Sequence, residues 1–208
     1  AGERGEAGDL PLTPPFGLFF AAVERFGFHG LEVRIVSESP PRSAMGGSST
    51  ALTALLQGLS SLGVRLGERP LPPKSLLLLG YHLEDGVSGG FCGMQDQAAA
   101  VYGGVNLWRW QYARPGAPFQ RERLLDARGG RALTRRLLVA HSGRDHESSP
   151  VNRRWVEDFL SGRTRKAWVR ANRLVHRLAL ALRARDWTGA AECLREEMTL
   201  RRELTPDA

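Results

Sequence analysis

Two glycines followed by three hydroxyl residues, at positions 46–50, most strongly limit what this chain can fold into. Before them, residues 31–36 (Leu-Glu-Val-Arg-Ile-Val) alternate apolar and polar side chains, which is typical of a half-buried strand. After them, residues 51–59 are apolar enough to form a packed helix. The pattern therefore predicts a strand, a flexible turn rich in hydroxyl groups, and a helix that begins at the turn.

Such a turn suits an anion. The first amides of a helix have no partner within the helix and carry partial positive charge, so a phosphate group can bind there. Gly46 and Gly47 allow the backbone to approach a ligand closely, and the hydroxyls of Ser48, Ser49 and Thr50 can donate to phosphate oxygens or help to hold magnesium. No lysine precedes the hydroxyl residues, which excludes a Walker A loop. An ordinary helix capped by Ser48 explains the turn equally well.

A second glycine-rich stretch, residues 86–93, leads into Met-Gln-Asp-Gln at positions 94–97. The carboxylate of Asp96, flanked by two amides at a loop-to-helix junction, could accept a proton from a substrate hydroxyl. Taken alone, Asp96 is more simply interpreted as a helix cap. Glu84 and Asp85 precede it and could share a divalent cation with a phosphate loop, or could be ordinary solvated residues at a helix end.

Apolar periodicity predicts a mixture of helices and short strands, and hence an α+β fold. The expected helices are 16–26, 48–62, 76–84, a short one at about 94–100, 151–160, 166–185 and 187–203, and the expected strands are 30–37, 105–110, 119–125 and 137–140. The helix at 76–84 is expected to end at Gly86. The polar loop at 141–150 has the composition of a ligand-lining loop, and the histidine and cysteine spacings match no known zinc site.

Composition narrows the class of partner. The net charge is +7, and because only two lysines occur, nearly all the positive charge is arginine. Since the arginines are dispersed along the expected helices with Glu and Asp among them, we expect no nucleic-acid partner, and an excess of this size suits an enzyme whose ligands are phosphates. No stretch approaches the ~20 apolar residues of a membrane span, so no membrane partner is expected. Two cysteines provide no disulfide framework, which favours a cytoplasmic location.

Three segments, taken in order, resemble the GHMP kinases. Residues 40–51 (P-P-R-S-A-M-G-G-S-S-T-A) are similar to the phosphate loop of that family, P-P-x-S-G-L-G-S-S-A. Residues 90–97, with two further glycines at 103–104, resemble the G-x-Q-D-Q…G-G segment of its sugar-kinase branch, which includes kinases of galactose and of heptose 7-phosphate. Residues 142–152 resemble the T-G-x-x-H-x-S…V-N loop of the same branch. The resemblance covers roughly residues 10–206.

This resemblance implies a GHMP kinase-like α+β fold in two parts. Residues 1–130 would be the central part of the N-terminal, ATP-binding domain, which has a ribosomal-S5-domain-2-like fold. Residues 131–208 would begin the helical, ferredoxin-like C-terminal domain. The N-terminal substrate motif and the glycine-rich C-terminal motif of the family are missing from these 208 residues, so we expect the middle part of a longer kinase.

The implied activity is transfer of the γ-phosphoryl group of ATP to a hydroxyl of a sugar or sugar phosphate, similar to heptose 7-phosphate. ATP and Mg²⁺ would be the cofactors, the sugar would be the small-molecule partner, and the protein would be a monomer or homodimer. The alternative is a truncated or non-catalytic relative that binds a nucleotide or a partner without turnover.

The resemblance also implies roles for individual residues. Asp96 matches the general base, and Ser48 with Glu84 matches the magnesium ligands, although Asp85 could take the place of Glu84. The nucleotide would be bound by Ser43, Met45, Gly46, Gly47, Ser48, Ser49 and Thr50. The substrate would be bound by Gln95, Gln97, His146, Ser148 and Asn152. Ala44 stands where the family has the first glycine of its loop.

Overall fold

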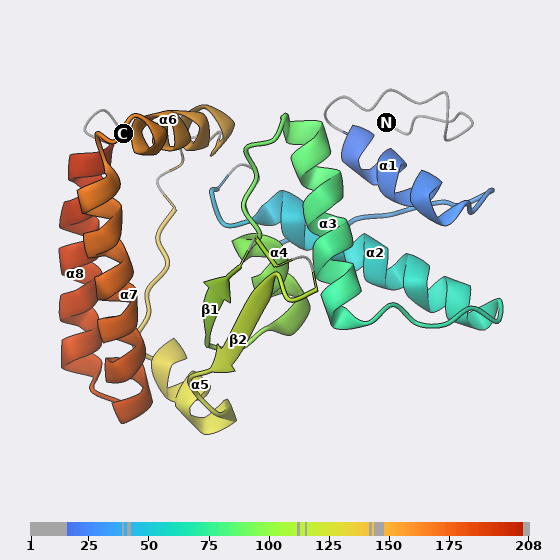
Figure 1. Ribbon diagram of the computed structural model, residues 1–208. Helices are drawn as coiled ribbons and strands as arrows, with labels where there is room; N and C mark the ends of the chain where they lie inside the picture. The colour runs from blue at the N-terminus through green and yellow to red at the C-terminus, as the bar shows by residue number, and fades with distance from the viewer. Residues whose placement is uncertain are drawn as a thin grey trace. The chain divides into compact units, whose positions relative to one another are not determined.

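The structure is a computed structural model that describes residues 16–38, 40, 43–111, 113–114, 116–141, 143 and 148–205 (Figure 1). The chain divides into two compact units. Unit 1 comprises residues 1–103 and 141–152, and unit 2 comprises residues 104–140 and 153–208.

Unit 1 is built on four helices: α1 (Gly17–Phe26), α2 (Gly47–Arg65), α3 (Pro73–Ser88) and α4 (Gln95–Tyr102). The apolar residues of α2 recur every three or four positions, so Leu52, Leu56 and Leu59 lie on one face and are buried. They pack against Ala22 of α1 and Leu76 of α3. This core fixes α2 against α1, α3 and α4, as Figure 1 shows.

The ends of these helices follow from proline and glycine. Helix α1 ends at Gly27, which adopts the left-handed conformation with φ of 65°. Helix α3 begins at Pro73 and continues through Gly86, because the left-handed residue that ends it is Gly89, with φ of 77°. The expected end at Gly86 is therefore wrong, and the extra turn extends α3 beyond Glu84.

Unit 2 contains a hairpin of two antiparallel strands, β1 (Asn106–Trp110) and β2 (Phe119–Arg123), in which Trp108 faces Arg121. Its other elements are α5 (Ala127–Thr134), α7 (Arg165–Ala184), α8 (Trp187–Leu204) and most of α6 (Ser148–Leu160), whose first residues belong to unit 1. Helices α7 and α8 pack side by side (Figure 1). Ala171, Leu200 and Leu204 form the core between them.

The expected strands at 105–110 and 119–125 and most of the expected helices are confirmed, and helices with one small sheet are consistent with the α+β class. Two expected strands are wrong. The structure forms no strand at 30–37 or at 137–140, where Val36 is 78% and Leu138 is 93% exposed. A strand needs a hydrogen-bonded neighbour, and among the described residues the hairpin strands pair only with each other. Helix α5 was not expected; Asp126 caps it by accepting a hydrogen bond from the amide of Gly129.

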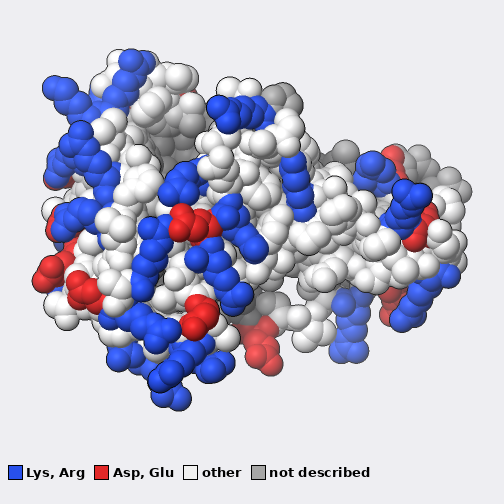
Figure 2. Space-filling view, turned by 60° about the horizontal axis from the view of Figure 1, so that its bottom comes forward, with Lys and Arg blue, Asp and Glu red and all other residues white. Residues whose placement is uncertain are grey.

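Charge is divided unevenly between the units. Unit 1 has 8 Lys and Arg against 12 Asp and Glu, whereas unit 2 has 21 against 10, which gives formal charges of −4 and +11. Figure 2 shows how densely basic side chains cover part of the surface. The basic residues are therefore concentrated in unit 2, rather than dispersed along the chain as the sequence suggested. Within the described residues, no helix has an apolar stretch long enough to cross a membrane.

Candidate functional site

Three helices of unit 1 bring their polar ends together around one carboxylate. At the start of α2, Ser48 Oγ donates to Glu84 Oε1 at 2.5 Å and Ser49 Oγ donates to Glu84 Oε2 at 2.6 Å. From α4, Gln97 Nε2 donates to Glu84 Oε2 at 2.6 Å. We call Ser48, Ser49, Glu84 and Gln97 the serine–glutamate cluster. It joins the glycine–serine turn to the end of α3.

Asp96 lies against the same turn. A Cβ atom placed on Gly46 would be 3.0 Å from Asp96 Cγ, so the carboxyl group occupies the space that the missing side chain of Gly46 leaves open. Burial and then the negative charge of Glu84 raise the pKa of Asp96. A raised pKa makes a carboxylate a better proton acceptor, which is the property that a general base needs.

Neither capping interpretation agrees with the structure. The N-cap of α2 is Gly46, and no side chain caps that helix. The N-cap of α4 is Met94, again without a side-chain hydrogen bond, and Asp96 lies within the first turn. The side chains of Ser48 and Asp96 therefore do not cap the helices in which they lie.

Asp85 has a different environment from Glu84. Its Oδ1 accepts a hydrogen bond from the amide of Cys92 at 3.0 Å, which holds the second glycine-rich loop. The structure therefore directs Glu84, and not Asp85, toward the hydroxyl groups of α2. Burial raises the pKa of the Cys92 thiol to about 11, so this thiol stays protonated at neutral pH and is a poor nucleophile.

The remaining residues of the nucleotide loop lie around the start of α2. Met45, Gly47 and Thr50 are exposed, Ser43 and Gly46 are half-buried, and Ser49 is buried. Helix α2 has no acidic residue in its first turn, so its own side chains do not repel an anion there.

The residues expected on the substrate side are more dispersed. Gln95 is exposed, whereas Gln97 is fully buried behind Glu84 and does not reach solvent. Asn152 Nδ2 donates to the carbonyl oxygen of Phe91 at 3.0 Å, which ties the start of α6 to the second glycine-rich loop. His146 lies outside the described residues. Ser148 is the first residue of α6, and its side chain also lies outside the described part.

Sequence reasoning missed the contact between Gln97 and Glu84. The two residues are thirteen positions apart on different helices, so helical periodicity gives no sign of their contact. The available signal was the position of Gln97 next to Ala98, which is buried. A side-chain amide that is buried with it needs a hydrogen-bond partner.

The donor set of the cluster fits magnesium bound together with phosphate. Among the described residues, no group of three or more His, Cys, Asp or Glu could hold a metal ion, which excludes a protein-only cage there. The cluster instead offers one carboxylate and two hydroxyl oxygens. Magnesium is commonly bound by one or two carboxylates while substrate phosphates and water complete its coordination.

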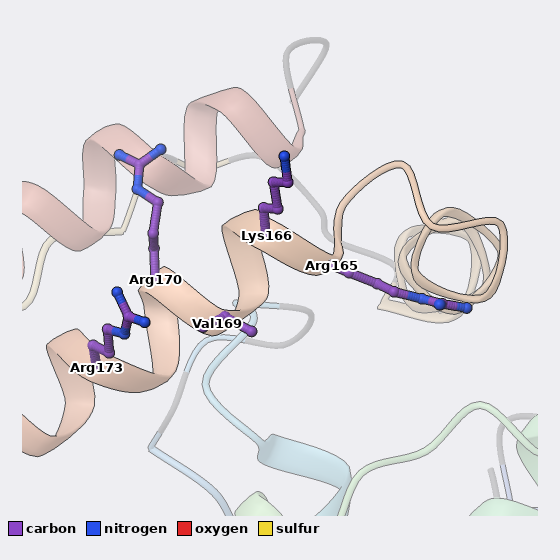
Figure 3. Close-up of a pocket in the computed structure, with 5 residues that line it drawn as sticks. All are labelled: Arg165, Lys166, Val169, Arg170 and Arg173. Carbon is purple, nitrogen blue, oxygen red and sulfur yellow. The ribbon is translucent and has the colours of Figure 1, made fainter.

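A hollow of about 340 Å³ lies on α7 of unit 2 (Figure 3). It is lined by Arg165, Lys166, Val169, Arg170 and Arg173. These residues provide neither a carboxylate nor a hydroxyl group. The hollow is therefore separate in chemistry from the serine–glutamate cluster.

Comparison with known proteins bears on the segment that holds the cluster. Residues 17–104 match the family model described as the GHMP kinases N terminal domain. This match supports the GHMP kinase family. The matched segment contains α1 to α4, and with them the cluster and Asp96, whereas the hairpin and α5 to α8 lie beyond it. No curated protein and no solved structure matches the chain.

Proposed function

We propose that this chain is a GHMP-type small-molecule kinase that transfers the γ-phosphoryl group of ATP to a hydroxyl of a sugar or sugar phosphate. The observation that carries the proposal is the position of Asp96 against Gly46, within the same group of helix ends that joins Ser48 and Ser49 to Glu84. The family match over residues 17–104 supports it independently of these contacts.

The start of α2 is the proposed phosphate site. The first amides of a helix have no acceptor within the helix, so those that follow Gly46 are available to a ligand. Gly46 has φ of 67°, a left-handed conformation that glycine adopts without strain and that turns the chain into α2. The exposed hydroxyl of Thr50 adds a further donor, whereas the hydroxyl hydrogen of Ser48 is already donated to Glu84.

Ser48 and Glu84 are the proposed magnesium ligands. When bound, ATP supplies the phosphoryl group and Mg²⁺ offsets the charge of its phosphates. Glu84 is already oriented by two hydroxyls and one amide, so its carboxylate is held at the start of α2. Preorganised charge of this kind contributes to catalysis because little rearrangement is needed during the reaction.

Gln97 is the proposed positioning residue for Glu84. It is fully buried and donates to Glu84 Oε2, while its own Oε1 has no hydrogen-bond partner in the described structure. An unpaired buried polar atom costs roughly 1–3 kcal/mol. A residue kept at that cost is better explained by the orientation of Glu84 than by direct contact with a substrate.

Asp96 is the proposed general base, which accepts the proton of the acceptor hydroxyl. For the sugar, we propose binding through Gln95, His146, Ser148 and Asn152, on the strength of the resemblance. Within the described residues Asn152 is held near the second glycine-rich loop, which leads directly into Asp96.

The test is an ADP-release assay of the whole chain with Mg²⁺ and ATP against hexoses, heptose phosphates and mevalonate. We expect release that depends on a sugar or sugar-phosphate acceptor and that falls in the Asp96→Asn variant. The same mixtures are followed by thermal unfolding, because a ligand that binds only the folded state raises the melting temperature. Stabilisation by Mg²⁺ and ATP without turnover on any acceptor would favour the non-catalytic alternative. Neither stabilisation nor turnover would refute both.

A further inference from the structure

Helix α7 has an unusual composition. Its 20 residues include no Asp or Glu, although they include six Lys and Arg residues. The six are Arg165, Lys166, Arg170, Arg173, Arg177 and Arg183. Because a typical solvated helix mixes both signs of charge, this composition calls for an explanation.

Four of these cations form a line along the helix, which we call the basic stripe: Lys166, Arg170, Arg173 and Arg177. They follow one another at steps of four, three and four residues, which places them on one face. At 1.5 Å per residue the stripe is about 16 Å long. All four side chains are exposed. An adjacent face of α7 packs against α8, where Ala171 is buried with Leu200 and Leu204.

The neighbours of the stripe neutralise only part of its charge. Arg170 pairs with Glu203 at 3.3 Å and Arg177 pairs with Glu196 at 2.7 Å, and both pairs are about half exposed. Such surface pairs contribute about 0–1 kcal/mol, so a stronger anion can displace them. Within the described residues, Lys166 and Arg173 have no ion-pair partner. In Figure 3, Lys166, Arg170 and Arg173 extend from the same part of α7, whereas Arg165 runs toward α6.

We propose that unit 2 binds the phosphate backbone of a nucleic acid along the basic stripe. A repeated line of cations matches a repeated line of phosphates better than it matches a single metabolite phosphate, which an enclosed site would hold. The charge of +11 on unit 2 would attract such a polyanion over a longer range. This proposal replaces the expectation of no nucleic-acid partner, which assumed that the arginines are dispersed.

An anionic membrane fits the stripe less well. A helix that lies on a membrane inserts a continuous apolar face. The buried apolar residues of α7 pack against α8, and the exposed Val169 and Leu180 are separated by Arg173 and His176. The stripe also lies outside residues 17–104, so the proposal is independent of the proposed kinase activity.

The test measures fluorescence anisotropy of labelled 20-nucleotide single-stranded RNA, single-stranded DNA and duplex DNA of the same sequence, titrated with the whole chain from 50 to 300 mM KCl. Four phosphate contacts would give a slope of about −3 to −4 in a plot of log affinity against log salt. The three arms show which nucleic acid binds best. Vesicles that contain phosphatidylserine are the competing ligand.

The deciding variant is Lys166→Ala combined with Arg173→Ala, which leaves both ion pairs to α8 intact. It should bind 10- to 100-fold more weakly at 100 mM salt, with a slope smaller by about 2. The matched control, Arg65→Ala with Arg69→Ala, removes the same charge from exposed positions of unit 1 and should bind within twofold of the parent. If the alanine variant loses helix content, Lys166→Gln with Arg173→Gln replaces it.

Unchanged affinity and slope in the stripe variant would overturn the proposal. Equal losses in the stripe variant and the control would also overturn it, because they would indicate a response to net charge alone. Binding to the vesicles but to none of the three nucleic acids would show that the partner is a membrane.

Discussion

The raised pKa of Asp96 favours its proposed role as a base but makes the folded protein less stable when the carboxyl group is ionised. Burial and the charge of Glu84 raise its pKa, so the folded protein holds its proton more tightly than the unfolded chain does. Stability is therefore lost as pH rises from the unfolded pKa of about 3.9 through the raised folded pKa. The feature that would make Asp96 an effective base also makes its ionised form unfavourable for folding.

Asp96→Asn should therefore separate activity from stability. We expect turnover to fall roughly a hundredfold or more, as it does when a general base is lost. We expect the melting temperature to rise at pH 7, and the difference from the parent to shrink toward pH 3.5, where the parent carboxyl group is largely protonated. Undiminished turnover would remove Asp96 from the mechanism, and a lower melting temperature at pH 7 would contradict its raised pKa.

Gly46→Ala tests the contact with Asp96. A Cβ atom on Gly46 would meet the Asp96 side chain at 3.0 Å, and the left-handed conformation adds about 1–2 kcal/mol of strain. Gly27→Ala is the matched control, because Gly27 has φ of 65° but nothing within 4 Å of such an atom. Urea unfolding should show a larger loss of stability for Gly46→Ala, and kinase activity should fall only in that variant. Equal losses would mean that Asp96 does not occupy this space.

Ala44→Gly should stabilise the turn. Ala44 has φ of 59°, and a left-handed conformation is unfavourable for a residue with a side chain. Glycine removes that strain, although its freer unfolded chain offsets part of the gain, so we expect a net increase of roughly 0.5 kcal/mol. Ala51→Gly, in the helical part of α2, should instead lower stability by about 0.5–1 kcal/mol. The same sign for both substitutions in urea unfolding would rule out strain at Ala44.

Residue types indicated much of the candidate site, but not which of its side chains contact one another. The order of glycines, hydroxyl residues and acids along the sequence indicated Ser48, Glu84 and Asp96. In the structure Ser48 donates a hydrogen bond to Glu84, and the Asp96 side chain lies against Gly46. The choice between Glu84 and Asp85 stayed open, because it depends on where α3 ends and on which side chain the Cys92 amide holds. Those are properties of three-dimensional packing.

At the scale of elements, two of the buried hydroxyls of helix α2, those of Thr53 and Ser60, have opposite hydrogen-bonding situations. Thr53 Oγ1 has no hydrogen-bond partner in the described structure, whereas Ser60 Oγ accepts from the amide of Leu71 at 3.0 Å. Thr53→Val should raise the free energy of unfolding by about 1 kcal/mol, because it removes an unpaired buried group. Ser60→Ala should lower it by about 1–2 kcal/mol, because it leaves the Leu71 amide unpaired. Chemical denaturation of both variants checks the opposite signs, and destabilisation by Thr53→Val would show that its hydroxyl has a partner.

The pattern of each element explains which ones could be predicted. The helical periodicity of apolar residues correctly predicted α7 and α8, which share a core. The alternation of apolar and polar residues correctly predicted the two strands of the hairpin, which pair with each other. The alternation of apolar and polar residues at 31–36 indicates an amphipathic segment. It does not indicate whether a neighbouring strand is present, and a strand needs such a neighbour to pair with. Helix α5 was missed because Gly129 and Gly130 lie inside it, and glycine ordinarily weakens a helix.

At the scale of the whole molecule, the tryptophans are confined to one of the two units. All five tryptophans, at positions 108, 110, 155, 168 and 187, belong to unit 2, whereas the proposed nucleotide site belongs to unit 1. Tryptophan fluorescence therefore reports on unit 2, and the unit that holds the serine–glutamate cluster contains no tryptophan.

Amide hydrogen exchange can report on ligand binding to unit 1. With Mg²⁺ and ATP at 100 times the dissociation constant, binding would stabilise the folded state by about 2.7 kcal/mol. We expect slower exchange in peptides that cover α2 to α4, and smaller changes in α7 and α8. Protection confined to α7 and α8 would place the nucleotide elsewhere and contradict the proposed site.

The exposed segment at 31–36 has a consequence for the behaviour of the protein in concentrated solution. If two copies pair antiparallel about Val33, Leu31 of one lies opposite Ile35 of the other, and Glu32 lies opposite Arg34. Exposed apolar segments that can pair in this way promote self-association into β-rich aggregates. Repulsion between chains of charge +7 opposes such growth, and added salt weakens that repulsion. Solubility, rather than folding stability, then limits the concentration that this protein can reach.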